Sequence, residues 1–390
     1  MPACFRIWLW GDAHVGTDLH HGRESLAEAL RQSAGGDPNS PSFDWDVALN
    51  IGDLSGSQAA PTDEEGREVV RQYRALATHP RESVYDIAGN HDRSHPREPA
   101  GWWFRRWVDP LGEHPEYSGV HRDRRPYPIE GTWERYMFTV GNLLFLMMSD
   151  INEPTQQRGR GDLGGNPGGV VSGETFEWWK QQVLGHPEHL IVSVHHYMLK
   201  NTTVASGPWE GMQKRPDGLW ESGYHGYKPE GTPQGASYLY WVGSVPDAEA
   251  FERFLAAHPG RVALWIGGHT HPLNPDDRAG GKPITATRWG THFINAAGLT
   301  RYHSHHAFRP SPMSRLLTLR EGETKIHVQL YLHTDDYSRR GWYAPAERWL
   351  TLPRPFRLAD PAKVFRTKRR QTGPQVGSPP PVPPPSASTV

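Results

Sequence analysis

A series of short apolar segments, each followed at once by Asp, Asn or His, is the feature that most limits how this chain can fold. Apolar runs of this length, bounded by Gly and polar residues, predict buried β-strands. Stretches with helical periodicity separate many of these runs, which is the pattern of a layered α/β fold. Because functional groups gather at the carboxyl ends of strands in open α/β sheets, we expect the polar clusters to converge on one site.

The periodicities predict the individual elements. Strands are expected over 5–10, 45–51, 84–88, 135–140, 143–148, 190–194, 262–266, 292–296, 316–319 and 326–332. Gly141-Asn142 separates two of these runs and fits a hairpin turn. Helices are expected over 63–78, 174–184 and 248–258, with Ser172 as a cap of the second.

Five polar clusters carry the chemistry. They are Asp12-Ala13-His14, Gly52-Asp53, Gly89-Asn90-His91-Asp92, His195-His196 and Gly268-His269-Thr270-His271. Each cluster alone is weak evidence, because Gly-Asp turns and solvated histidine loops are common. Together they supply imidazole, carboxylate and amide donors, a set that suits Mn, Fe or Zn. The residues counted as donors are Asp12, His14, Asp53, Asn90, His195, His269 and His271. Seven donors are too many for one ion, so the sequence predicts two divalent metal ions that share a carboxylate.

In this order the clusters resemble the motifs of the calcineurin-like metallophosphoesterase superfamily, over about residues 5–300. The resemblance implies a four-layer αββα sandwich, in which helices flank two mixed β-sheets and the dimetal site lies at their apex. It implies one metal held by Asp12, His14 and His271, the other held by Asn90, His195 and His269, and Asp53 as the bridge between them. His195 is preferred to His196 because the family's ligand is usually the first histidine of such a pair.

The resemblance also implies a mechanism. A metal-bridging hydroxide attacks phosphorus in line with the leaving group, whose oxygen His91 protonates as a general acid. Asp92 is expected to orient the His91 imidazole. Arg93, His95 and His196 are expected substrate contacts.

Departures from known branches of the family narrow the activity. Leu54-Ser55-Gly56 follows Asp53, where protein serine/threonine phosphatases have Val-Asp-Arg-Gly and purple acid phosphatases place a tyrosine at the position of Gly56. We therefore expect hydrolysis of a small organic phosphodiester. A phosphomonoesterase or a nuclease on the same site is the alternative within enzymes. The alternative from another class is a catalytically silent scaffold that binds a protein partner.

Composition limits the expected partners and cellular location of the protein. The chain has 42 Lys+Arg against 43 Asp+Glu, a formal net charge of −1, which argues against a nucleic-acid partner. No apolar run approaches the ~18 residues of a membrane helix, so no membrane span is expected. The single cysteine, Cys4, cannot form an intramolecular disulfide, and the first residues resemble a strand rather than a signal peptide. These features predict a cytoplasmic location.

The chain is expected to form one catalytic domain over 1–360, with inserted segments at about 95–134 and 199–243. Many of the 16 Trp fall in these inserts, where they either line a substrate pocket or pack against the sandwich; packing is the expectation for most of them. Residues 361–390 are basic and then Pro-rich, which predicts a disordered tail that could bind a proline-recognising partner.

Overall fold

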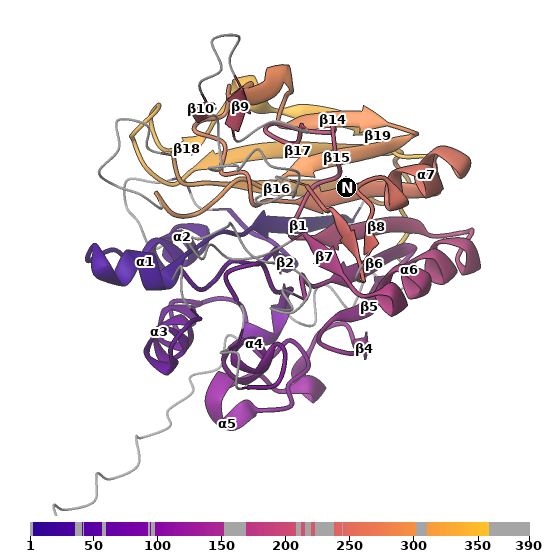
Figure 1. The fold of residues 1–390 in the computed structure, drawn as a ribbon. Coiled ribbons are helices and arrows are strands. Elements are labelled where there is room, and N and C mark those ends of the chain that lie inside the picture. The colour runs from indigo at the N-terminus through magenta and orange to yellow at the C-terminus, as the bar shows by residue number, and fades with distance from the viewer. Residues whose placement is uncertain are drawn as a thin grey trace, which may run out of the picture.

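Two mixed β-sheets of seven strands each form the centre of the molecule (Figure 1). The computed structural model describes residues 3–35, 41, 43–56, 60–92, 94, 98–151, 169–207, 212–214, 220–222, 238–243, 245–301 and 310–358. The first sheet has the strand order β18-β17-β16-β1-β2-β3, and β19 also pairs with β17. The second sheet has the order β14-β15-β13-β8-β6-β5-β4.

The strands of the first sheet are β1 (Cys4–Trp10), β2 (Val47–Asn50), β3 (Val84–Asp86), β16 (Met313–Arg320), β17 (Lys325–Leu332), β18 (Gly341–Trp342) and β19 (Arg348–Thr351). Those of the second are β4 (Glu130–Gly131), β5 (Arg135–Val140), β6 (Leu143–Met148), β8 (Leu190–His195), β13 (Val262–Gly267), β14 (Thr285–Arg288) and β15 (Thr291–Asn295). Two small sheets contain β7 (Val170–Val171), β11 (Trp241–Val242) and β12 (Val245–Pro246), and β9 (Met212–Lys214) with β10 (Trp220–Ser222).

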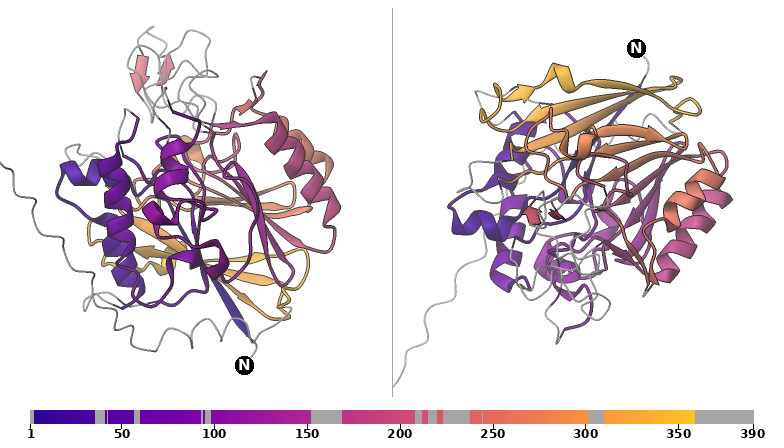
Figure 2. Two further views of the ribbon diagram at one scale, coloured as in Figure 1. Left: turned by 90° about the horizontal axis from the view of Figure 1, so that it is seen from below. Right: turned by 45° about the horizontal axis from the view of Figure 1, so that its top comes forward.

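The helices are α1 (Val15–His20), α2 (Ser25–Ser33), α3 (Asp63–Tyr73), α4 (Trp102–Trp107), α5 (Pro115–Ser118), α6 (Gly173–Gly185) and α7 (Ala250–Ala257). Helices α1 to α3 lie on the outer side of the first sheet, and α6 and α7 cover the second (Figure 2). The order of layers is therefore helices, sheet, sheet, helices, as the resemblance to the calcineurin-like family implies.

Alternation along β1 shows how the layers form. Phe5, Ile7 and Leu9 belong to the core between the sheets, whereas Trp8 and Trp10 belong to the core under the helices. Successive side chains of a strand point to opposite faces. From Ile7 to Trp10 every residue of β1 is apolar and buried, so this part of the strand is covered on both faces. Such a strand is the natural centre of a four-layer fold.

The hairpin strands β5 and β6 have the predicted bounds, and the other predicted strands differ by a few residues at their ends. Ser172 caps α6 as expected, since its side chain accepts a hydrogen bond from the backbone N–H of Thr175. The sequence analysis missed α1, α2, α4 and α5, which have four to nine residues and too few turns for a clear periodic pattern. Helix α3 ends at Tyr73, earlier than the predicted residue 78.

The described part of the first insert packs against α3. The side chains of Trp103 and Trp107 are buried, and the Trp103 Nε1–H donates to the backbone oxygen of Thr62 at 2.8 Å. A Cβ on Gly66 of α3 would come within 2.2 Å of Trp107 Cγ. These tryptophans therefore fill the contact between insert and helix.

None of the described helices combines the length and the apolar character that a bilayer crossing requires.

Candidate metal centre

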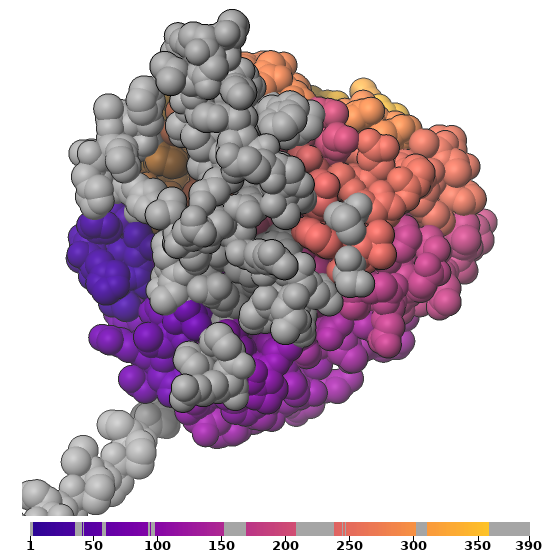
Figure 3. Space-filling view, in the orientation of Figure 1, coloured from indigo at the N-terminus to yellow at the C-terminus, as the bar shows by residue number. Residues whose placement is uncertain are grey.

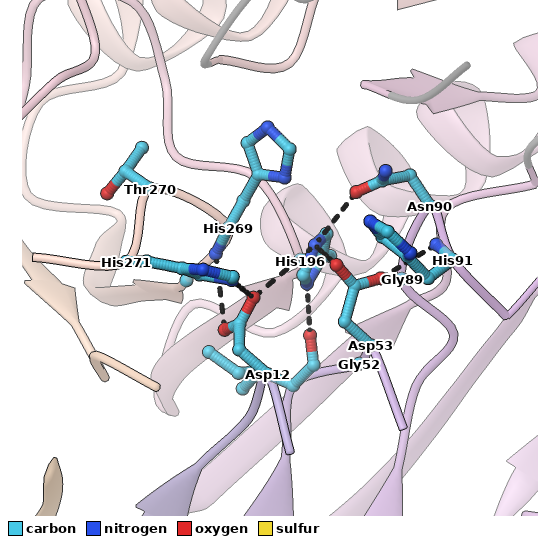
Figure 4. A network of polar contacts seen from close by, with 12 residues as sticks. Asp12, Gly52, Asp53, Gly89, Asn90, His91, His196, His269, Thr270 and His271 are labelled. Atoms are coloured by element: carbon cyan, nitrogen blue, oxygen red, sulfur yellow. Dashed lines mark hydrogen bonds and ion pairs between the residues drawn. The ribbon is translucent and has the colours of Figure 1, made fainter. Parts of the chain in front are cut away.

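The polar clusters meet where the carboxyl ends of five strands come together (Figure 4). Strands β1, β2 and β3 pair in parallel in the first sheet, and β8 and β13 pair in parallel in the second. The loops that follow them carry Asp12 and His14, Asp53, Asn90 and His91, His196, and His269 and His271. Both sheets therefore contribute to one site, as the sequence predicts.

The first group of potential ligands is Asp12, His14, Asp53 and His271, whose donor atoms all lie within 4.8 Å of one another. Asp12 Oδ1 is 2.8 Å from His271 Nε2, and His14 Nε2 is 3.1 Å from His271 Nε2. The other ring nitrogen of His14 lies 3.0 Å from the backbone oxygen of Ser55. If that nitrogen carries the proton and donates it, Nε2 is left with its lone pair for a cation.

The second group is Asp53, His196 and His269, and it satisfies the same distance limit. His196 Nε2 lies 3.1 Å from Asp53 Oδ2 and 3.2 Å from Asn90 Oδ1, which adds the predicted amide oxygen to this group. His196 Nδ1 lies 2.8 Å from the backbone oxygen of Ile51. Asp53 belongs to both groups, as expected for a bridging ligand.

The choice of His195 over His196 does not fit this geometry. His195 Nδ1 accepts a hydrogen bond from the backbone N–H of Tyr197 at 3.0 Å, and His195 belongs to neither ligand group among the described residues. The cause is strand alternation. Val192 and Val194 face the core between the sheets, so His196 shares their face and His195 points to the helix side. This parity was readable in the sequence and would have selected His196.

The same geometry corrects the assignment of His196 as a substrate contact. The other expected substrate contacts, Arg93 and His95, lie outside the described residues. His196 is completely buried, between Asp12 and Asp53 (Figure 4). We therefore place it among the candidate ligands.

Five of the candidate ligands adopt left-handed backbone conformations. Their φ angles are 50° at Asp12, 43° at His14, 56° at Asp53, 67° at His269 and 39° at His271. Non-glycine residues rarely adopt such angles, which cost about 1–3 kcal/mol each. Five of them in one cluster indicate a functional site whose strain the surrounding structure offsets.

Glycines allow the ligand loops to come close together. A Cβ on Gly89 would lie 2.2 Å from Asp53 Oδ1, and a Cβ on Gly268 would lie 2.6 Å from Asp12 Oδ2. Neither contact could form without moving the carboxylate. Steric contact with the two carboxylates thus explains why glycine precedes Asn90 and His269 in the sequence motifs.

The electrostatics of the cluster are those of a site built for cations. Burial alone would lower the pKa of His196, but Asp53 and Asp12 outweigh burial and raise it to about 10. Burial, together with His91 and His271, lowers the pKa of His14 well below its usual value. Burial would raise the pKa of Asp53, but His196 and His91 hold it well below the usual range. Without metal, the protonated His196 therefore pairs with the ionised Asp53, and His14 is neutral. A divalent metal bound by these carboxylate and imidazole donors would take the place of the His196 proton.

His91 and Asp92 follow the last ligand of the first sheet, Asn90. The backbone N–H of His91 donates to Asp53 Oδ1 at 2.8 Å, and its ring packs edge-on against His14 at 4.7 Å between centroids. His91 therefore lies beside the candidate ligands.

The carboxylate of Asp92 holds backbone groups of the loops around Asp53, a role that the sequence does not predict. Its Oδ2 accepts the backbone N–H groups of Asp53 and Gly89 at 2.8 and 2.9 Å, and its Oδ1 accepts that of Ser55 at 2.8 Å. Both carboxylate oxygens thus hold the backbone of the Asp53 loop. Burial and the neighbouring Asp53 raise the pKa of Asp92 to about 7.

Comparisons with known proteins agree with this geometry. A family model described as calcineurin-like phosphoesterase matches residues 5–273. No curated protein sequence matches the chain.

The solved structures that match the chain do so at low sequence identity and low TM-score. GAP50, the anchor in the inner membrane complex of Plasmodium, is 10% identical with a TM-score of 0.44, over 97% of this chain and 100% of its own. Vps29 from Cryptosporidium parvum is 13% identical with a TM-score of 0.33, over 90% and 99%. Vps29 from Entamoeba histolytica, complexed with Zn²⁺, is 12% identical with a TM-score of 0.31, over 89% and 99%. The family model spans well over half of the sequence, and the chain therefore belongs to the calcineurin-like phosphoesterase family.

Proposed function

We propose that this protein is a metal-dependent phosphoric ester hydrolase that acts on a small organic phosphodiester. The observation that carries the proposal is the sharing of Asp53 between two complete ligand groups. Asp53 Oδ2 lies 3.1 Å from His196 Nε2 in one group and 3.8 Å from His14 Nε2 in the other. One carboxylate between two sets of imidazoles is the arrangement that a pair of metal ions about 3.5–4 Å apart requires.

The residues present fit two divalent ions. The donors are imidazole nitrogens, carboxylate oxygens and the Asn90 amide oxygen, a mixed set that suits Mn, Fe or Zn. Asp12, His14 and His271 would hold one ion, Asn90, His196 and His269 would hold the other, and Asp53 would contact both. Bound there, the ions would lower the pKa of a water and neutralise charge on phosphoryl oxygens.

His91 supports the choice of a phosphodiester. A diester has a poor leaving group, and a proton delivered to the departing oxygen lowers that barrier. The His91 side chain lies against His14, and its backbone is tied to Asp53, so its ring is fixed relative to the ligands. We assign His91 as the proton donor. A phosphomonoester is the closest alternative, because the same ligands would serve it.

A catalytically silent scaffold is the alternative from another class. Loss of catalysis in such a protein would be expected to remove metal ligands, yet each ligand position of this site is occupied by a suitable donor. A nuclease would need a basic groove, for which the net charge of −1 gives no support. A cytoplasmic location and a proline-recognising partner for residues 361–390 remain predictions from the sequence alone.

Two neighbouring histidines provide the sharpest test. Metal content and turnover of a bis-aryl phosphate and a mono-aryl phosphate would be measured for the unmodified protein, His196→Ala and His195→Ala. We expect two metals per chain, faster turnover of the diester, and loss of both properties in His196→Ala. The matched control, His195→Ala, should keep two metals and turnover.

The outcomes separate the alternatives. Faster turnover of the mono-aryl substrate would replace the diesterase by a phosphomonoesterase. Two bound metals without turnover of any phosphate ester would favour the scaffold. Equal metal loss in both histidine variants would overturn the ligand assignment.

A further inference from the structure

Arg315 breaks the apolar pattern of its strand. In β16 the side chains of Leu317 and Leu319 face the core between the two sheets. Arg315 occupies the same face two residues earlier, opposite Leu9 of β1, and is only 2% exposed. A charged side chain in a core-facing position is a departure that usually has a functional reason.

One nitrogen of the Arg315 guanidinium is bonded and another is buried without a partner. Its Nε donates to the backbone oxygen of Asn295 at 2.5 Å, while Nη2 is buried without a hydrogen-bond partner among the described residues. No carboxylate of the described chain forms an ion pair with it. Burying an arginine without a counter-ion is costly, and an apolar side chain of similar size would fill the space at a lower cost. Packing therefore does not explain why this residue is an arginine.

The hydrogen bond to Asn295 connects the two sheets. Arg315 belongs to β16 of the first sheet, and Asn295 is the last residue of β15 in the second. The Asn295 side chain donates through Nδ2 to Thr270 Oγ1 at 2.8 Å. Thr270 lies between the candidate ligands His269 and His271 (Figure 4). Two hydrogen bonds thus separate Arg315 from the ligand loop after β13.

The residues after Asn295 are bonded to both sides of the site. The backbone N–H of Ala296 donates to Gly267, directly before the ligand loop, at 2.7 Å. The N–H of Leu299 donates to Gly11 at 3.1 Å, and that of Thr300 donates to Asp12 at 3.2 Å. Residues 295–300 therefore join the loop of Asp12 in the first sheet to the loop of His269 and His271 in the second.

We propose that Arg315 is a positioning residue that holds the candidate metal ligands His269 and His271 in place through Asn295. The inference rests on the proposed metal site. The strained φ angles of 67° at His269 and 39° at His271 require support from neighbouring structure, and the Arg315–Asn295–Thr270 chain supplies it from behind the loop. Residues of this kind, outside the ligand set, fix ligand orientation and tune affinity.

The test compares two buried arginines. Arg315→Met removes the guanidinium and keeps an unbranched apolar side chain. The matched control is Arg125→Met, because Arg125 is also buried and donates to backbone oxygens, those of Glu82, Val84 and Pro110, at the base of the insert. Mn²⁺ affinity of the metal-free protein would be measured by calorimetry, and unfolding by heat would be followed in the same samples.

We expect Arg315→Met to weaken Mn²⁺ binding by about 10- to 100-fold, the range found when groups behind metal ligands are removed. Backbone amides of residues 268–271 should exchange hydrogen faster in the metal-free variant. Arg125→Met should lower the unfolding temperature and leave Mn²⁺ affinity unchanged.

A second variant protects the test against a folding defect. Thr270→Val removes the acceptor of the Asn295 bond and should weaken Mn²⁺ binding in the same direction. Unchanged affinity in both Arg315→Met and Thr270→Val, or an equal loss in Arg125→Met, would overturn the inference. Metal affinity is measured without substrate, so the inference can hold even where no phosphate ester is hydrolysed.

Discussion

Replacing Asp92 by Asn tests the revised role of this carboxylate. The two oxygens of Asp92 accept three backbone N–H groups, from Asp53, Gly89 and Ser55. The asparagine side chain keeps the shape of Asp92 but only one of its oxygens. At best that oxygen continues to accept the backbone N–H groups of Asp53 and Gly89. The amide NH₂ then faces the backbone N–H of Ser55, and because both groups are donors, no hydrogen bond forms between them.

The energetic cost follows from these contacts. An unsatisfied buried N–H costs about 1–3 kcal/mol, and hydrogen bonds to an ionised acceptor contribute about 1.5–3 kcal/mol each against about 1 kcal/mol for neutral ones. One lost bond and two weakened bonds therefore predict a fall of about 2–7 kcal/mol in the free energy of unfolding. Because the freed segment carries Asp53, metal affinity should fall by about 10- to 100-fold as well.

A control elsewhere in the chain separates stability from metal binding. Asp109 is also buried, and its carboxylate accepts the N–H groups of Glu113 and His114 and the Ser118 hydroxyl, in the insert. Asp109→Asn should lower stability to a similar extent in chemical unfolding but leave Mn²⁺ binding unchanged in calorimetry. An unaltered Mn²⁺ affinity in Asp92→Asn, or an equal loss in Asp109→Asn, would refute the reasoning.

Three further predictions follow. His91→Ala should lower kcat on a diester by about 10²–10⁴-fold while two metals stay bound by elemental analysis; metal loss would mean that His91 is a ligand. Gly89→Ala should abolish high-affinity metal binding because its Cβ would lie 2.2 Å from Asp53 Oδ1, whereas Gly185→Ala, with open space around the new Cβ, should bind normally. Burial lowers the pKa of His333 to about 3, so the unfolded chain binds a proton that the folded chain excludes between about pH 6.5 and 3. As the pH is lowered through that window, the free energy of unfolding should therefore fall, by up to about 1.4 kcal/mol per pH unit more in the unmodified protein than in His333→Gln. Urea unfolding at several pH values measures both slopes, and equal slopes would contradict this assignment.

The sequence was sufficient to predict the strands and the gathering of the polar clusters, because both depend on local patterns, and the family resemblance supplied the four-layer order. Alternation places Phe5 and Ile7 on one face of β1 and Trp8 on the other, and this pattern is visible without coordinates. The polar clusters follow strands whose direction puts them at one edge. His195 was chosen from the usual pattern of the family, whereas strand parity from Val192 and Val194, like the ligand geometry, favours His196.

The supporting contacts could not be predicted in the same way. Asp92 bonds to the backbone of Asp53 across 39 positions of sequence, and Arg315 bonds to Asn295 in the other sheet. Which backbone groups are left without a partner after the strands end depends on the packed structure. A sequence motif shows that Asp92 follows His91, but it does not show which N–H groups the carboxylate will meet.

The site lies at the junction of the two sheets, and this position explains why it needs residues that hold the ligands in place in addition to the ligands themselves. Asp12, Asp53 and Asn90 come from the first sheet, and His196 and His269 come from the second, so relative movement of the sheets would change every ligand distance. Strained loops cannot hold such distances by themselves, because their backbone conformations are unfavourable in isolation. Rigid groups outside the ligand set must do so, one among the loops of the first sheet and one between the two sheets. Asp92 fits the first description and Arg315 the second, and this is why their variants should weaken metal binding without removing a single ligand.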